Sequence, residues 1–110
     1  MSARRASAVV ALVTCPGPAA AARLADALIR RRVAACVNIV PSIRSVYRWK
    51  GKIERAGESL LVIKTPARAF ERLRRAVIEL HPYDVPEVIA LPIKAGHAPY
   101  LSWVFRSVSP

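Results

Sequence analysis

Residues 43–64 read IRSVYRWKGKIERAGESLLVIK, and this stretch has the pattern of one long β-hairpin. Alternate side chains of a strand share a face, and here one face of the incoming strand would carry Ile43, Ser45, Tyr47 and Trp49. Lys50-Gly51 predicts the tight turn, and Ala56-Gly57 predicts a β-bulge on the return strand. Strands of roughly twelve residues are about twice the usual length. Such a hairpin projects beyond a small domain and needs a surface to lie on.

The chain before the hairpin predicts a strand, a helix and the start of the second strand. Residues 8–14 are almost entirely apolar, as in a central strand buried on both faces. Pro18 opens a helix that runs to about Arg32, since proline suits the first helical position. The second strand begins near Cys36, and Pro41 predicts a bend within it because proline cannot donate to the ladder. The apolar stripe of the helix is formed by Ala21, Leu24, Ala25, Leu28 and the stem of Arg32.

The chain after the hairpin predicts a helix, a strand and a short final helix. Thr65 is placed to cap the helix, with Pro66 in its first turn. His81-Pro82 ends it, because the residue before proline is disfavoured in helical geometry. Residues 88–93 and 99–108 supply the fourth strand and the last helix. The element order β-α-β-β-α-β predicts an α+β, ferredoxin-like fold in one domain over residues 8–110, after a flexible N-terminus at residues 1–7.

Composition narrows the class of protein. The 110 residues carry 18 Lys+Arg against 7 Asp+Glu, a net charge of +11 that would attract phosphates, acidic proteins or anionic lipid. No apolar run approaches the ~20 residues of a membrane span, so no membrane partner is expected. Arg4-Arg5 followed by AVVALVTC imitates a secretory signal, but its apolar core is short and the domain needs it as a strand. Two cysteines are too few for a disulfide framework, and a cytoplasmic location is expected.

Four segments together identify a family resemblance. AACVNIVPSIRSVYRWKGKI, LLVIKT, LHPYDVPEVIALPI and YLSW resemble the divalent-cation tolerance protein family CutA, over roughly residues 8 to 105. The resemblance implies a ferredoxin-like subunit in a tight homotrimer, with long hairpins crossing subunit boundaries. It also implies a cytoplasmic bacterial protein that responds to copper and other divalent metals without established catalysis. The trimeric plan is shared with the PII signalling proteins, so the alternative is a sensor that binds a small molecule or anion at subunit clefts.

Two positions depart from the family pattern. Lys50 stands at the hairpin tip where relatives usually carry an acidic residue, and Pro16-Gly17-Pro18 replaces the usual Pro-Asp. Neither change threatens the fold, but Lys50 argues against an acidic contact at the tip.

The residues of the hairpin support a trimer independently of the resemblance. Both faces carry large apolar side chains, which a monomer would leave in water: Val46, Tyr47, Trp49 and Ile53. Closed rotational assembly covers such surfaces.

The resemblance also implies a weak copper site. Cys36 and His81 match two family ligands, whereas the remaining cysteine position is Val13 and Cys15 lies two residues further on. In this topology Cys15 and Cys36 lie at opposite ends of parallel strands, which excludes a disulfide within one subunit. The helix delivers His81 to the Cys15 end, so Cys36 and His81 could share an ion only between two subunits. The alternatives to metal binding are purely structural: Cys36 as a small buried apolar residue, and His81 as a hydrogen-bond donor at the end of the helix.

The segment HPYDVPE, residues 81–87, offers a second candidate site. Asp84 and Glu87 could serve as an acid–base pair, and Lys64 could hold an anion in a cleft lined by Tyr83 and Tyr100. No nucleophile is flanked by a base and no glycine-rich phosphate loop is present, so no enzyme is expected. We expect a rigid connector that the trimer turns into the wall of a cleft. The first and third strands have no aromatic residue, which argues against specific nucleic-acid binding.

Overall fold

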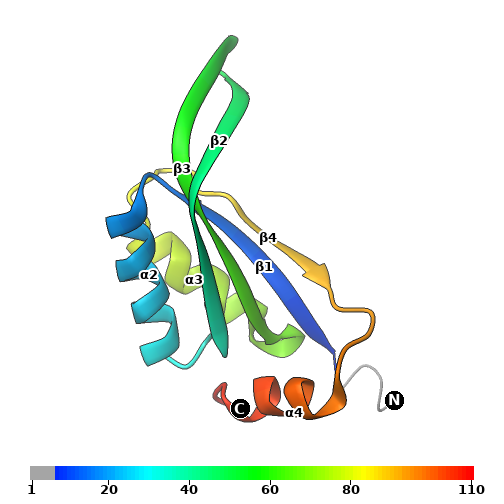
Figure 1. The fold of residues 1–110 in the computed structure, drawn as a ribbon. Coiled ribbons are helices and arrows are strands. Elements are labelled where there is room, and N and C mark those ends of the chain that lie inside the picture. The colour runs from blue at the N-terminus through cyan, green and yellow to red at the C-terminus, as the bar shows by residue number, and fades with distance from the viewer. Residues whose placement is uncertain (1–6) are drawn as a thin grey trace.

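The computed structural model describes residues 7–110 (Figure 1). Residues 1–6, most of the N-terminus predicted to be flexible, lie outside the described residues. The carbonyl of Ser7 accepts a hydrogen bond of 3.0 Å from the Ala67 amide. The elements in chain order are β1 (Ala8–Cys15), α2 (Pro18–Arg30), β2 (Cys36–Trp49), β3 (Lys52–Pro66), the 3-10 turn η1 (Ala67–Ala69), α3 (Phe70–Leu80), β4 (Val88–Pro92) and α4 (Ala98–Arg106).

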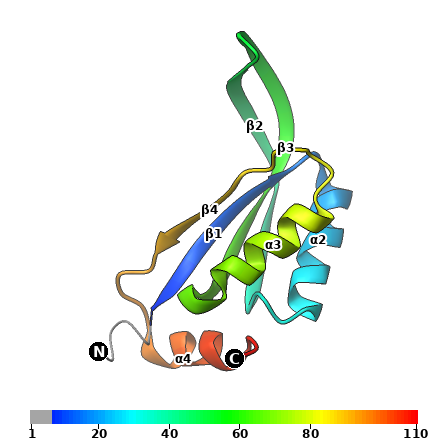
Figure 2. The same ribbon diagram turned by 180° about the vertical axis from the view of Figure 1, so that it is seen from behind.

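The four strands form one sheet in the order β2-β3-β1-β4, and all neighbouring strands are antiparallel. Helices α2 and α3 cover one face, and α4 lies across the end of the sheet opposite the hairpin tip (Figures 1 and 2). The predicted α+β, ferredoxin-like βαββαβ arrangement with a long hairpin and a C-terminal helix is therefore confirmed.

The core lies between the sheet and the two helices. The inward side chains of β1 and β3 are fully buried against the stripes of α2 and α3; they include Ala11, Val13, Leu61, Ile63, Leu28, Leu73 and Val77. The other face of the sheet carries the cross-strand pairs Leu12↔Ile89 and Val10↔Leu91, in which Ile89 is 48% and Leu91 50% exposed. The prediction that β1 is buried on both faces is therefore wrong for a single chain, because no helix covers that second face.

Both major helices differ from the prediction at one end. Helix α2 stops at Arg30, because Arg32 has a φ of 58°, in the left-handed region that ends a helix. Arg32 is exposed, so its stem is not part of the buried stripe. Thr65 does not cap α3: β3 continues to Pro66, and the Thr65 hydroxyl donates to the Val33 carbonyl at 2.8 Å. The predicted end of α3 at His81 is confirmed.

The hairpin of β2 and β3 extends past the rest of the sheet and makes the molecule 46 Å long against 25 and 22 Å (Figure 2). Its turn is at Lys50-Gly51, as predicted, and both residues have positive φ, 51° and 80°. The irregularity in pairing lies on β2 between Val40 and Ile43. The predicted bulge at Ala56-Gly57 is wrong, since both pair regularly with β2; the bend predicted at Pro41 is where the extra residue sits. Ser59 donates to the Pro41 carbonyl at 2.8 Å and holds this bend.

Among the described residues, none of the helices has the length and apolar character that crossing a membrane requires.

Candidate functional site

The residues singled out in the sequence fall into two clusters along β3. Glu58, in the middle of β3, lies beside the connector from α3 to β4, and Lys64, near the end of the strand, pairs with Cys36. They are six positions apart, about 20 Å at ~3.3 Å per residue. The structure therefore does not bring Lys64 into one cleft with Tyr83 and Glu87 within a chain, so the anion cleft considered from sequence could form only between subunits.

His81 joins the end of α3 to β1. Its Nε2 lies 2.7 Å from the Thr14 carbonyl oxygen, which can only accept, so Nε2 carries the proton and donates it. Its Nδ1 accepts the Tyr83 amide proton at 3.0 Å. The side chain is 7% exposed. Both ring nitrogens are thus in use, and the hydrogen-bonding role considered from sequence is present with a strand carbonyl as acceptor.

Tyr83 and Glu58 anchor the connector to β3. The Tyr83 hydroxyl donates to the Glu58 carboxylate at 2.9 Å, and Glu58 is 8% exposed. Burial and the bond to Glu58 raise the pKa of Tyr83 to about 12, so the hydroxyl keeps its proton at neutral pH. The rings of His81 and Tyr83 lie 4.8 Å apart at 50°. These hydrogen bonds agree with the rigid connector predicted from sequence.

A hollow of about 760 Å³ opens between this connector and the base of the hairpin. Asp84 and Glu87 both line it, together with Glu58 and the rings of Tyr47, Trp49 and Tyr83. Among residues 7–110, no lysine or arginine lines this hollow, although the chain carries 18 basic residues. The described lining therefore has the charge for a cationic ligand rather than for the anion considered from sequence, and Tyr100 is not part of it.

Cys15 ends β1 in this same region and is fully buried. Burial, and to a lesser degree the nearby Glu58 carboxylate, raise the pKa of the Cys15 thiol to about 11. At neutral pH it is a protonated thiol, which is a poor ligand and a poor nucleophile.

The second cluster surrounds Cys36, the first residue of β2. Its Sγ lies 3.7 Å from Asn38 Oδ1, and the Lys64 ammonium donates to that same oxygen. Tyr100 of α4 approaches from the end of the sheet; burial and the neighbouring Cys36 raise the pKa of Tyr100 above its ordinary value. Cys36 is half-exposed, so it is not the fully buried small residue considered from sequence. It is the accessible one of the two thiols.

The register places the two cysteines as expected. Cys15 pairs with Ser59 and Cys36 with Lys64, five positions apart along β3 and on strands separated by it. A disulfide within the chain is excluded, and both cysteines are free. His81 lies at the Cys15 end, as predicted. Within residues 7–110 there is no group of three His, Cys, Asp or Glu side chains that could hold a metal ion.

Glu58 and Asn38 were missed from sequence. Glu58 is the one acid directly before the apolar run SLLVIK, and such a position has a reason to be examined because a buried carboxylate needs a partner. Asn38 lies two residues after Cys36, on the same face of the strand, and that spacing could have placed it beside the thiol.

These features define the class of protein: a ferredoxin-like α+β subunit with a projecting hairpin, an uncovered apolar sheet face and one accessible thiol at the start of β2. Residues 9–107 match the family model of the CutA1 divalent ion tolerance protein. The chain belongs to this family, whose name describes tolerance of divalent ions rather than a chemical reaction.

Individual relatives agree with the family match. The chain is similar to the divalent-cation tolerance protein CutA of Thermus thermophilus, at 48% identity over 86% of this chain and 92% of that one. It is 49% identical to protein CutA of Mus musculus over 87% of its length but spans only 54% of that relative. The crystal structure of CutA1 from Oryza sativa superposes with a TM-score of 0.92 at 47% identity, covering 96% of this chain and 97% of that one.

Proposed function

We propose that this chain forms a cytoplasmic homotrimer that binds copper or another divalent cation weakly and confers tolerance to it, without catalysing a reaction. Membership of the divalent ion tolerance family carries this proposal. Metal is the cargo of such a protein, so its ligands need accessible lone pairs rather than a closed structural cage.

Cys36 is the proposed ligand. Thiolate is the side-chain ligand that soft Cu(I) prefers, and Cys36 is the accessible thiol. Asn38 Oδ1 lies close by, while the Lys64 ammonium, bonded to that amide, discourages a hard dication. This donor set favours Cu(I) over Zn(II), and the further ligands would come from a second subunit.

His81 fits the copper site less well. The lone pair of Nδ1 accepts the Tyr83 amide and Nε2 is protonated, so this bond must break or the ring must turn before His81 can bind a metal. As a ligand, His81 therefore stays a prediction whose test must separate metal uptake from stability.

The trimer rests on the uncovered surface of the single chain. Val46 is 64%, Ile53 55% and Trp49 49% exposed on the hairpin, and the open sheet face adds Ile89 and Leu91. Apolar surface on two connected faces is typical of a chain that associates with copies of itself.

Native mass spectrometry of the reduced protein, titrated with Cu(I), Cu(II) and Zn(II), tests the proposal. We expect a trimer that takes up Cu(I) and loses this uptake in Cys36→Ala but not in Cys15→Ala, the control at the buried thiol. For His81→Ala, metal uptake is measured by mass spectrometry, and stability is measured separately by urea unfolding with a chelator that removes metal. Lost stability with retained uptake assigns His81 a structural role, and lost uptake at unchanged stability assigns it a ligand role. A trimer that stays free of copper at micromolar concentration contradicts the metal proposal.

A further inference from the structure

The hairpin sorts its charges by face. The strand register pairs Arg44 with Gly57 and Val46 with Arg55, so both arginines lie on one face as diagonal neighbours. The two carboxylates of the hairpin, Glu54 and Glu58, pair with residues of the opposite face. Diagonal positions in an antiparallel pair are about 7–8 Å apart, within reach of one small anion for side chains as long as arginine.

The side chains of Arg44 and Arg55 make no ion pair or hydrogen bond with any residue from 7 to 110. Elsewhere arginines do find partners: Arg30 pairs with Asp26, and Arg31 binds Glu79 through two bonds. Two like charges on one face without a counter-charge repel each other, and an anion between them would relieve this repulsion.

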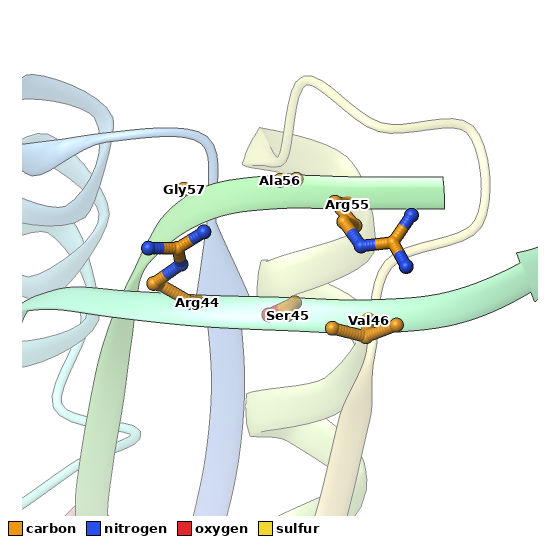
Figure 3. A pocket seen from close by; sticks show the side chains of 6 residues that line it. All are labelled: Arg44, Ser45, Val46, Arg55, Ala56 and Gly57. Carbon is orange, nitrogen blue, oxygen red and sulfur yellow. The ribbon is translucent and has the colours of Figure 1, made fainter. Parts of the chain in front are cut away.

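A hollow of about 350 Å³ lies between the two guanidinium groups. Figure 3 shows Arg44 and Arg55 at its two ends: Arg44 extends from its strand toward the other one, and the Arg55 guanidinium lies in the gap between the strands, directed away from Arg44. Gly57 keeps it open, because it lies opposite Arg44 without a side chain and a Cβ there would meet nothing within 4 Å. Ser45 and Ala56 also line the hollow, although the register turns their side chains to the other face. Val46 adds an exposed apolar wall. The volume is at the lower end of the range of small-molecule sites.

We propose that Arg44 and Arg55 form a binding site for a phosphate group carried on a small organic molecule. The tetrahedral group offers three free oxygens to donors that approach from two strands, whereas the two oxygens of a carboxylate are satisfied by one guanidinium fork. The hollow is larger than a phosphate ion, and Val46 can contact the organic part. This site is distinct from Cys36 and does not rest on the copper proposal.

Calorimetric titration at constant ionic strength with phenyl phosphate and inorganic phosphate tests the site. We expect wild-type protein to bind phenyl phosphate, and Arg44→Gln and Arg55→Gln each to weaken binding about tenfold or more, because a charge-assisted hydrogen bond is lost. Arg48→Gln is the matched control: Arg48 lies four residues after Arg44 on the same face, pairs with Ile53, and does not line the hollow. It should change the affinity by less than about twofold, since only long-range charge is altered. The ratio of the wild-type affinities for phenyl phosphate and for inorganic phosphate distinguishes a site for an esterified phosphate from a site for the free ion.

Two results overturn the site. Equal weakening in all three variants would mean attraction to net charge alone. Absence of phosphate binding, with the trimer weakened in Arg44→Gln but not in Arg48→Gln, would assign the pair to carboxylates of a second copy. Circular dichroism and urea midpoints confirm that each variant is folded.

Discussion

The two thiols of this chain differ in reactivity because their strands place one at the surface and bury the other. Cys36 begins β2 and is half-exposed beside Asn38, whereas Cys15 ends β1 under the connector and is fully buried. Accessibility and thiolate content govern both alkylation and metal binding, which is why Cys36 rather than Cys15 is the proposed ligand for soft ions.

The raised pKa of Cys15 makes stability depend on alkaline pH. Its folded pKa of about 11 lies above the ordinary 9.0, so this contribution to stability is fully present below pH 9 and is lost as pH rises through 11. From pH 8 to pH 10 the thiol should cost the native state about 1.4 kcal/mol, because only the unfolded chain ionises there. Urea unfolding at pH 8, 9 and 10 measures this slope.

Cys15→Ala is the control for this slope. It lowers stability at every pH through the lost packing, but the decline between pH 8 and pH 10 should be shallower than in the wild type by the amount given above. Parallel declines for the two proteins would contradict the assigned pKa.

At the scale of elements, the hairpin turn shows what local sequence can and cannot dictate. Lys50 and Gly51 both have positive φ, the conformation of a tight hairpin turn that glycine adopts freely and lysine adopts at a cost. We expect Lys50→Asn to raise the free energy of unfolding by about 0.5–1 kcal/mol, because asparagine tolerates the left-handed region at this turn position. Urea midpoints measure the gain.

Lys52→Asn is the matched control for the turn, since it removes the same charge from the first residue of β3, where the backbone is extended. An equal gain in both variants would trace the effect to charge instead of backbone conformation.

The elements themselves were predictable because each has a strong local pattern. The alternation in β2, the stripe of α2 and the proline after α3 placed those elements and the fold. The bulge could not be located from sequence, since Gly57 attracts attention while the register is decided by Pro41, whose carbonyl is held by Ser59 from the next strand. The start of α3 was missed for the same reason. The Thr65 hydroxyl has the chemistry of a helix cap, but it donates a hydrogen bond to the carbonyl of Val33 in the loop between α2 and β2.

The candidate site was less predictable, because residues with suitable chemistry do not all lie close together in the fold. Tyr83 and Lys64 were considered for one cleft from sequence, yet Tyr83 contacts Glu58 in the middle of β3, whereas Lys64 lies near the end of that strand. Topology alone correctly separated Cys15 from Cys36, since strand order and direction fix which ends meet.

At the scale of the whole molecule, the apolar residues of the hairpin and of the open sheet face are exposed in the single chain, and we expect association to cover them. A chain with a net charge of +11 repels copies of itself, so association needs enough apolar contact to offset that repulsion. Asp84 and Glu87, in the hollow at the base of the hairpin, can in addition attract a basic surface of another copy.

Replacing Ile53 by glutamate tests this assembly directly. Ile53 is 55% exposed on β3 of the hairpin, and a carboxylate buried at a subunit interface there would cost several kcal/mol. We expect Ile53→Glu to convert the trimer to monomer, measured by light scattering after size exclusion at micromolar protein. Ile78→Glu is the control, because Ile78 is 47% exposed on α3, away from the hairpin and the open sheet face, and makes the same change of net charge. A trimer that survives Ile53→Glu, or dissociates equally with Ile78→Glu, would remove the hairpin from the interface and leave its apolar residues to another partner.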